Sequence, residues 1–172
     1  MESTPTRPTA LKYGLIMGLV MAAYTLILSL TGQSFNQTLG YVSYVIIIGV
    51  IFLAMREYKS LNEGFMTFKQ GLGIGVLASL IGGTISSAFS FVYMTFIDPD
   101  FIAKLQEFTR SEMEKNQDLS PAQVDQAMEM TSFMMTPGAM FVMGIIGSVI
   151  LGLIVSLIMS AILKNEPPME DY

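Results

Sequence analysis

Methionine is the side chain whose clustering comes closest to a chemical signal in this sequence. Six of the fifteen methionines fall between Met128 and Met143. Thioether sulfurs are good ligands for Cu(I), so such a cluster would suit a copper site. Methionine is also the flexible apolar residue that fills irregular gaps, and the chain contains no histidine and no cysteine to complete a metal site. We therefore expect these methionines to pack, and we expect no cofactor and no metal.

Carboxylates and hydroxyl groups are the remaining candidates for chemistry. Asp98 and Asp100 flank a proline, and we interpret them as helix caps because no histidine is present to act as a general base or metal ligand. A phosphate-binding glycine loop and a nucleophile elbow are also missing, so we expect no catalytic residue and no enzymatic activity. Hydroxyls within apolar segments could line a pore, although serines in helices more often bond to their own backbone. The candidates for such a lining are Tyr24, Ser86, Ser87, Ser90 and Tyr93.

The composition predicts that helices position these residues within a membrane. The chain is 52% hydrophobic and 13% charged, whereas soluble domains are about 25% charged. Long uncharged stretches separate the charged groups, and about 20 helical residues cross a hydrocarbon core. Only helices and closed barrels satisfy their backbone groups in lipid, so we expect an all-α polytopic membrane protein. The net charge is −5 and no basic patch exists, which excludes a nucleic-acid partner.

Four transmembrane helices are expected, with one exported segment between the third and the fourth. The first stretch could instead be a cleavable signal peptide, but no small-residue cleavage site follows Leu30. Six lysines and arginines lie on the side of the termini and three on the other side, so the positive-inside rule places both termini in the cytoplasm. The predicted segments are a tail at 1–10, spans at about 11–30, 39–55, 71–97 and 138–163, an exported loop at 98–137, and a tail at 164–172.

The sequence of the exported loop predicts an amphipathic helical hairpin. Asp98-Pro99 offers an N-cap followed by proline, and Ser120 to Gln123 forms a capping box. The apolar faces of the two helices could pack on each other or on lipid, or they could form a docking face for a partner in the envelope. The residues of this predicted docking face are Phe101, Leu105, Phe108, Val124, Met128, Met134 and Met135.

Small residues recur at every fourth position of the third and fourth spans. Such residues let helix backbones approach closely, and this packing drives helix association in lipid. We predict that the third and fourth spans pack together through these stripes, and the competing use is a homo-oligomer interface. The stripes are Gly71, Gly75, Ser79, Gly83 and Ser87 in the third span, and Gly144, Ser148, Gly152, Ser156 and Ser160 in the fourth.

Several motifs spread along the chain resemble one known family. They are Glu63-Gly64-Phe65 with Phe68-Lys69-Gln70, the step from Ile97 to Phe101, Pro137 before the last span, and the run from Gly152 to Ile158 that leads to Lys164. In these motifs the chain resembles the bacterial membrane proteins grouped as domain of unknown function 4199. The resemblance implies four spans in a bacterial inner membrane, and it implies no activity and no site residue.

These observations favour a non-enzymatic scaffold or interaction protein that presents the hairpin outside the membrane. Its partners would be the lipid bilayer and either an envelope protein or further copies of itself. The alternative is a small homo-oligomeric pore or uncoupled transporter. Apart from tyrosine, the spans contain no ionisable side chain, which counts against an ion-coupled carrier because such carriers place charged groups in the membrane.

Overall fold

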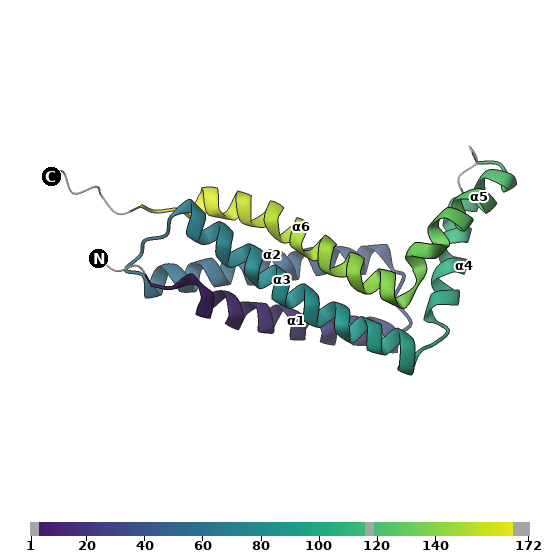
Figure 1. Cartoon of the computed structure of the whole chain (residues 1–172), viewed down its shortest axis with the longest axis horizontal. Helices are drawn as coiled ribbons and strands as arrows, with labels where there is room; N and C mark the ends of the chain where they lie inside the picture. Colours follow the sequence, from purple (N-terminus) through teal and green to yellow (C-terminus); the bar gives the residue numbers. More distant parts are fainter. Residues whose placement is uncertain (1–3, 116–118, 167–172) are drawn as a thin grey trace.

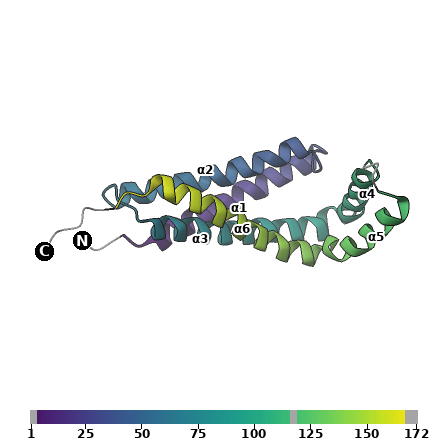
Figure 2. The ribbon, with the colours of Figure 1, turned by 90° about the horizontal axis from the view of Figure 1, so that it is seen from above.

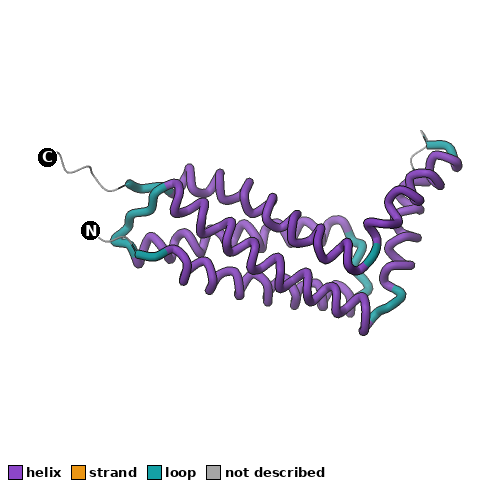
Figure 3. Tube along the Cα trace, in the orientation of Figure 1, coloured by secondary structure: helices purple, strands orange, loops and turns teal. Residues whose placement is uncertain are grey.

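The computed structural model describes residues 4–115 and 119–166, and the regular structure in these residues is helical apart from one isolated bridge between Met66 and Asn165 (Figure 3). Four helices are long and apolar enough to cross a membrane: α1, α2, α3 with the π-helical turn that extends it, and α6. The chain is therefore an all-helical protein with the features of a multi-pass membrane protein. The elements are α1 (Thr6–Leu30), α2 (Gln37–Leu61), α3 (Phe68–Val92), the π-helical turn η1 (Tyr93–Ile97), α4 (Phe101–Glu114), α5 (Pro121–Ser132), the 3-10 turn η2 (Phe133–Met135) and α6 (Pro137–Leu163).

The first two helices are longer than the uncharged stretches that predict them. Helix α1 begins at Thr6, and α2 continues to Leu61 through the charged residues that follow Met55. Charge does not end a helix, because lysine, arginine and glutamate are good helix formers. Helix α2 ends where the backbone turns left-handed, at Glu63 with φ of 54° and Gly64 with φ of 86°.

The four long helices lie side by side, and both termini lie at one end of the molecule (Figure 1). We call this end, which holds residues 4–12 and 57–68 with 163–166, the termini end. Several hydrogen bonds link different segments of the chain at this end. Lys59 Nζ donates to the Leu163 carbonyl over 3.0 Å, and the Thr4 amide donates to Asn62 Oδ1 over 3.0 Å. The backbones of Met66 and Asn165 exchange two hydrogen bonds of 2.8 and 2.9 Å.

The hydrophobic core occupies the half of the molecule next to the termini end. Ile51, Met55, Tyr58, Met66 and Ile74 are fully buried there. The Tyr58 hydroxyl donates to the Thr4 carbonyl over 2.8 Å, which satisfies its polar atom. Toward the other end, the pair α1 and α2 leans away from the pair α3 and α6, so the four helices form a wedge (Figure 2).

Helices α4 and α5 project from the far end of the wedge, where α3 and α6 meet them (Figure 1). The capping box predicted at Ser120 is confirmed, with Gln123 as its second member. The prediction of Asp98 as the N-cap of α4 is wrong. Helix α4 begins at Phe101, and the Asp98 carboxylate instead accepts from Lys104 Nζ over 2.9 Å, because the ammonium group competes for it.

Candidate functional site

The two small-residue stripes face each other in antiparallel order, and at each level a glycine on one helix lies opposite a serine on the other. A Cβ added at Gly71 would lie 2.5 Å from Ser160 Oγ, and a Cβ added at Gly144 would lie 2.5 Å from Ser87 Oγ. At the three levels between them, a Cβ added to the glycine would overlap the side chain of the opposing serine. The matched pairs along the interface are Gly71–Ser160, Gly75–Ser156, Ser79–Gly152, Gly83–Ser148 and Ser87–Gly144.

The serines at this interface use their hydroxyl groups in two ways. Ser148 Oγ lies 2.8 Å from the Ile145 carbonyl of its own helix and 3.2 Å from the Ser79 carbonyl across the interface. Ser79 Oγ and Ser156 Oγ are buried and have no hydrogen-bond partner among the described residues. Each lies against the α-carbon of its opposing glycine, where a weak Cα–H···O contact is the available interaction. The stripes thus bring α3 and α6 together within one chain.

Helix α1 contacts α3 through a second set of glycines. A Cβ at Gly14 would lie 2.7 Å from Ile81 Cβ, and one at Gly18 would lie 2.6 Å from Ile85 Cβ. On the other side of the contact, Gly82 accommodates the side chain of Met17. The close glycine contacts between α1 and α3 lie at Gly14 and Gly18 of α1 and at Gly82 of α3.

A cavity of about 570 Å³ fills the wedge beyond these contacts. It lies among all four long helices, and it has two causes in the structure. Helix α2 leans away from α6 (Figure 2), and Gly147 of α6 has no side chain to fill the space. Nothing lies within 4 Å of a Cβ added at Gly147. The lining residues are Met17, Met21, Thr25, Tyr44, Ile47, Gly82, Gly83, Ser86, Ser87, Ser90, Met94, Met140, Gly144, Gly147, Ser148, Ile150, Leu151 and Ile154.

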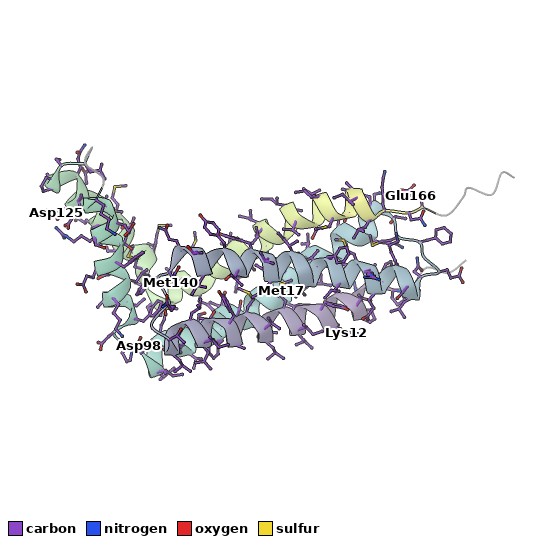
Figure 4. The ribbon with its side chains drawn as sticks, turned by 180° about the vertical axis from the view of Figure 1, so that it is seen from behind. Lys12, Met17, Asp98, Asp125, Met140 and Glu166 are labelled. Atoms are coloured by element: carbon purple, nitrogen blue, oxygen red, sulfur yellow. The ribbon has the colours of Figure 1, made fainter. Side chains whose placement is uncertain are left out.

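A smaller cavity of about 100 Å³ continues the first one toward α4. The two cavities share Thr25, Ser90, Met94 and Met140, and the smaller one adds Phe101 of α4. The π-helical turn contributes to both, since its buried Met94 lines them. Such turns are rare and frequently occur at functional sites. Figure 4 shows Met17 midway along the spans and Met140 near the base of α6 and α4, so the lining extends over much of one half of the molecule.

The structure places three of the five predicted pore hydroxyls in the main cavity, namely those of Ser86, Ser87 and Ser90. Tyr93 lines only the smaller cavity. Tyr24 lies in neither lining set, and its hydroxyl donates to the Leu39 carbonyl over 2.8 Å. Sequence reasoning missed the methionines and Thr25, because only the tertiary arrangement brings residues of α1 and α6 to one space.

The walls of the cavity are neutral. None of the lining residues in the described part of the chain carries an ionisable acid or base other than tyrosine. Ser86 Oγ lies 3.2 Å from the Gly83 carbonyl and is satisfied locally. Asp98 and Lys104, which lie near the far end, form an ion pair, and the hydrogen bond to Asp98 raises the pKa of Lys104. The arrangement therefore suits an uncharged, mainly apolar molecule.

The predicted docking face is divided between several environments. Phe35, from the turn between α1 and α2, stacks on Phe108 with ring centroids 5.1 Å apart and contacts Phe101 at 5.5 Å. Val124 is buried. Leu105, Met128 and Met135 are half-buried, and Met134 is 47% exposed. The aromatic face of α4 thus fastens α4 to the α1–α2 turn over the far end of the wedge.

The methionines between Met128 and Met143 do not surround one point. Met130 is 74% exposed, and Met134 and Met143 are each 47% exposed. Among residues 4–115 and 119–166, histidine, cysteine, aspartate and glutamate form no group that could hold a metal ion.

Comparisons with known proteins give one match. No curated protein and no solved structure matches the chain. The model of the family described as "Protein of unknown function (DUF4199)" matches residues 12–165, which include α1 from Lys12 onward, the other three long helices, the cavity and both helices of the projecting segment. The chain belongs to this DUF4199 family.

Proposed function

We propose that this protein binds an uncharged, mainly apolar ligand in the cavity between its four long helices, without chemical conversion of the ligand. The observation that carries the proposal is a cavity of about 570 Å³ among helices that are otherwise closely packed. Ligand sites have volumes of about 300 to 1,000 Å³ and combine apolar walls with a few polar groups. The hydroxyls of Thr25 and Ser90 supply such groups here.

A pair of glycine substitutions tests this proposal. Gly147→Leu places a leucine side chain in the cavity, where nothing lies within 4 Å of its Cβ. Gly73→Leu is the matched control, because Gly73 is exposed, lies outside the lining and also has open space around it. The full chain is purified in a mild detergent, freed of bound molecules, and melted with and without a total membrane extract.

The extract should raise the melting temperature of the wild type and of Gly73→Leu, and it should have little effect on Gly147→Leu. An equal effect on all three proteins, or no effect on any, would contradict ligand binding in this cavity.

We further propose that the protein resides in a bacterial inner membrane with both termini in the cytoplasm. The excess of lysine and arginine at the termini end supports this orientation. The cavity then lies in the outer half of the membrane, and α4 and α5 form a helical hairpin on the outer side. Arg110 links the two helices through a 2.6 Å ion pair with Asp125 and also pairs with Glu114 at 2.9 Å.

Docking of an envelope protein on the hairpin is the second candidate function. An exposed apolar patch at the junction of α5 and η2 favours it, since Met130 is 74% exposed and Phe133 is 79% exposed. Affinity purification in mild detergent compares the wild type with Met130→Ser/Phe133→Ser and with a chain that lacks 99–136. A partner lost from both altered chains supports docking, and an unchanged set of partners contradicts it.

A further inference from the structure

The shape of the cavity narrows the class of ligand. On α3 and the turn that extends it, the lining runs from Gly82 to Met94, which corresponds to about 18 Å at 1.5 Å per residue. A volume of about 570 Å³ over this length gives a mean cross-section of about 30 Å². The cavity is therefore elongated along the helices, and its mean cross-section accommodates a single hydrocarbon chain. We call this elongated cavity the channel.

The chemistry of the walls agrees with this shape. Four methionines, Met17, Met21, Met94 and Met140, line the channel and come from three different elements. Thioether side chains adapt to flexible apolar partners. Along the channel, the hydroxyls of Ser86 and Ser148 bond to backbone carbonyls of their own helices. At the far end, Thr25, Ser29 and Ser90 surround the smaller cavity. A molecule with a long apolar body and one uncharged polar end would match this distribution.

The channel also opens toward the lipid. Tyr44 on α2 and Ile150 and Ile154 on α6 line it, and each is about half exposed at the gap between these two helices. At this depth the surroundings of a membrane protein are hydrocarbon chains. The channel is thus continuous with the lipid-facing surface of the helices, and a chain can enter it sideways without crossing water.

We infer that the cavity holds one hydrocarbon chain of an uncharged membrane lipid, with the polar end of the lipid next to Thr25, Ser29 and Ser90 and the chain directed toward Met17. This inference rests on the proposed ligand binding and specifies the ligand. Phe101 closes the channel above the hydroxyl groups, and the contact of Phe35 with Phe101 and Phe108 holds α4 in that position. Acyl chains and isoprenoid chains share this chemistry.

Photolabelling in a bilayer tests the inference on the full chain. The protein is reconstituted in nanodiscs of phosphatidylethanolamine and phosphatidylglycerol. One sample contains a diacylglycerol with a diazirine at the end of an acyl chain, and another contains a polyprenol with a diazirine at its apolar end. Labelled residues are mapped by mass spectrometry, and the two samples distinguish the two kinds of chain.

Labelling is expected on the inner wall of the channel, at Met17, Ile47 and Leu151, in the wild type and in Gly73→Leu. It should fall about tenfold or more in Gly147→Leu, because the leucine side chain occupies the space of several methylene groups. Ser86→Leu fills the channel from α3 instead of α6 and should have the same effect if Gly147→Leu fails to fold.

Labels confined to the outer faces of the helices with both probes, or equal labelling of the channel in the filled variants, would overturn the inference. If photolabelling fails in either of these ways while the membrane extract still stabilises the wild type but not Gly147→Leu, the cavity binds a ligand other than a lipid chain. The lipid inference and the proposed function can therefore fail separately.

Discussion

Exchanging Ser79 and Gly152 across the α3–α6 interface would test the pairing of glycine with serine directly. A Cβ at Gly152 would overlap both Oγ and Cβ of Ser79. Carbon atoms pack about 3.5–4.0 Å apart, so Gly152→Ser must separate the two helices by about 1 Å. Such overpacking costs about 1–3 kcal/mol. Ser79→Gly alone removes a buried side chain and adds a flexible residue, at a cost of about 0.5–1 kcal/mol.

The double variant Ser79→Gly/Gly152→Ser restores the pair in the opposite sense. We expect its free energy of unfolding to return to within about 1 kcal/mol of the wild type, which corresponds to a coupling of about 1–3 kcal/mol between the two sites. Unfolding by sodium dodecyl sulfate in mixed micelles, followed by circular dichroism, measures these values without tryptophan, which the chain lacks.

Gly147→Ser is the control, since it lies on the same helix and a Cβ there meets nothing within 4 Å. Its effect should stay within about 0.5 kcal/mol and should not depend on Ser79→Gly. If the destabilisation of the Ser79/Gly152 double variant equals the sum of the two single effects, the reasoning about the stripe is refuted.

Two further predictions concern the far end of the molecule, and a third concerns its orientation in the membrane. Phe35→Ala removes the stacking on Phe108 at 5.1 Å and should lower the local stability of α4 by about 0.5–1.5 kcal/mol. Amide hydrogen exchange should become faster in α4 but not in the core of α3, and unchanged exchange in α4 would contradict the aromatic contact. Ser120→Ala removes the capping box and should weaken α5 by about 1 kcal/mol, which the same exchange experiment detects; equal protection of α5 would show that the cap is dispensable. Because the chain has no cysteine, a single cysteine in place of Asp125 should react with a membrane-impermeant maleimide in intact cells and one in place of Glu166 only after lysis, and the reverse pattern would contradict the orientation.

The sequence predicts the number and approximate place of the long helices because long uncharged stretches have a single stable form in lipid. It also predicts which faces of α3 and α6 contain small residues. The register that places each glycine opposite a serine depends on how α3 and α6 pack together, so the stripe of one helix alone does not predict it. The angle at which α2 leans away is likewise a tertiary feature. It depends on where the neighbouring helices touch, such as the contacts of α1 with α3 near Gly14 and Gly18.

The structure adds local contacts at the loop that the sequence does not predict. Asp98 has the residue type and position of an N-cap, but Lys104 offers its carboxylate a charged partner. The aromatic residues of α4 that are part of the candidate docking face contact Phe35, a single aromatic residue in an otherwise polar turn. An apolar ring in such a turn is the signal that could have indicated the contact. The cavity has no comparable signal, because its lining residues are spread from Met17 to Ile154.

A crystal structure of the full chain grown from a lipidic mesophase would test ligand binding in the cavity most directly. We predict elongated electron density between α1, α2, α3 and α6, running from the level of Met17 to that of Met140, with α4 closed over its far end. A structure in which α2 has moved against α6, so that the side chains of Ile47 and Leu151 fill the space, would contradict the proposed site.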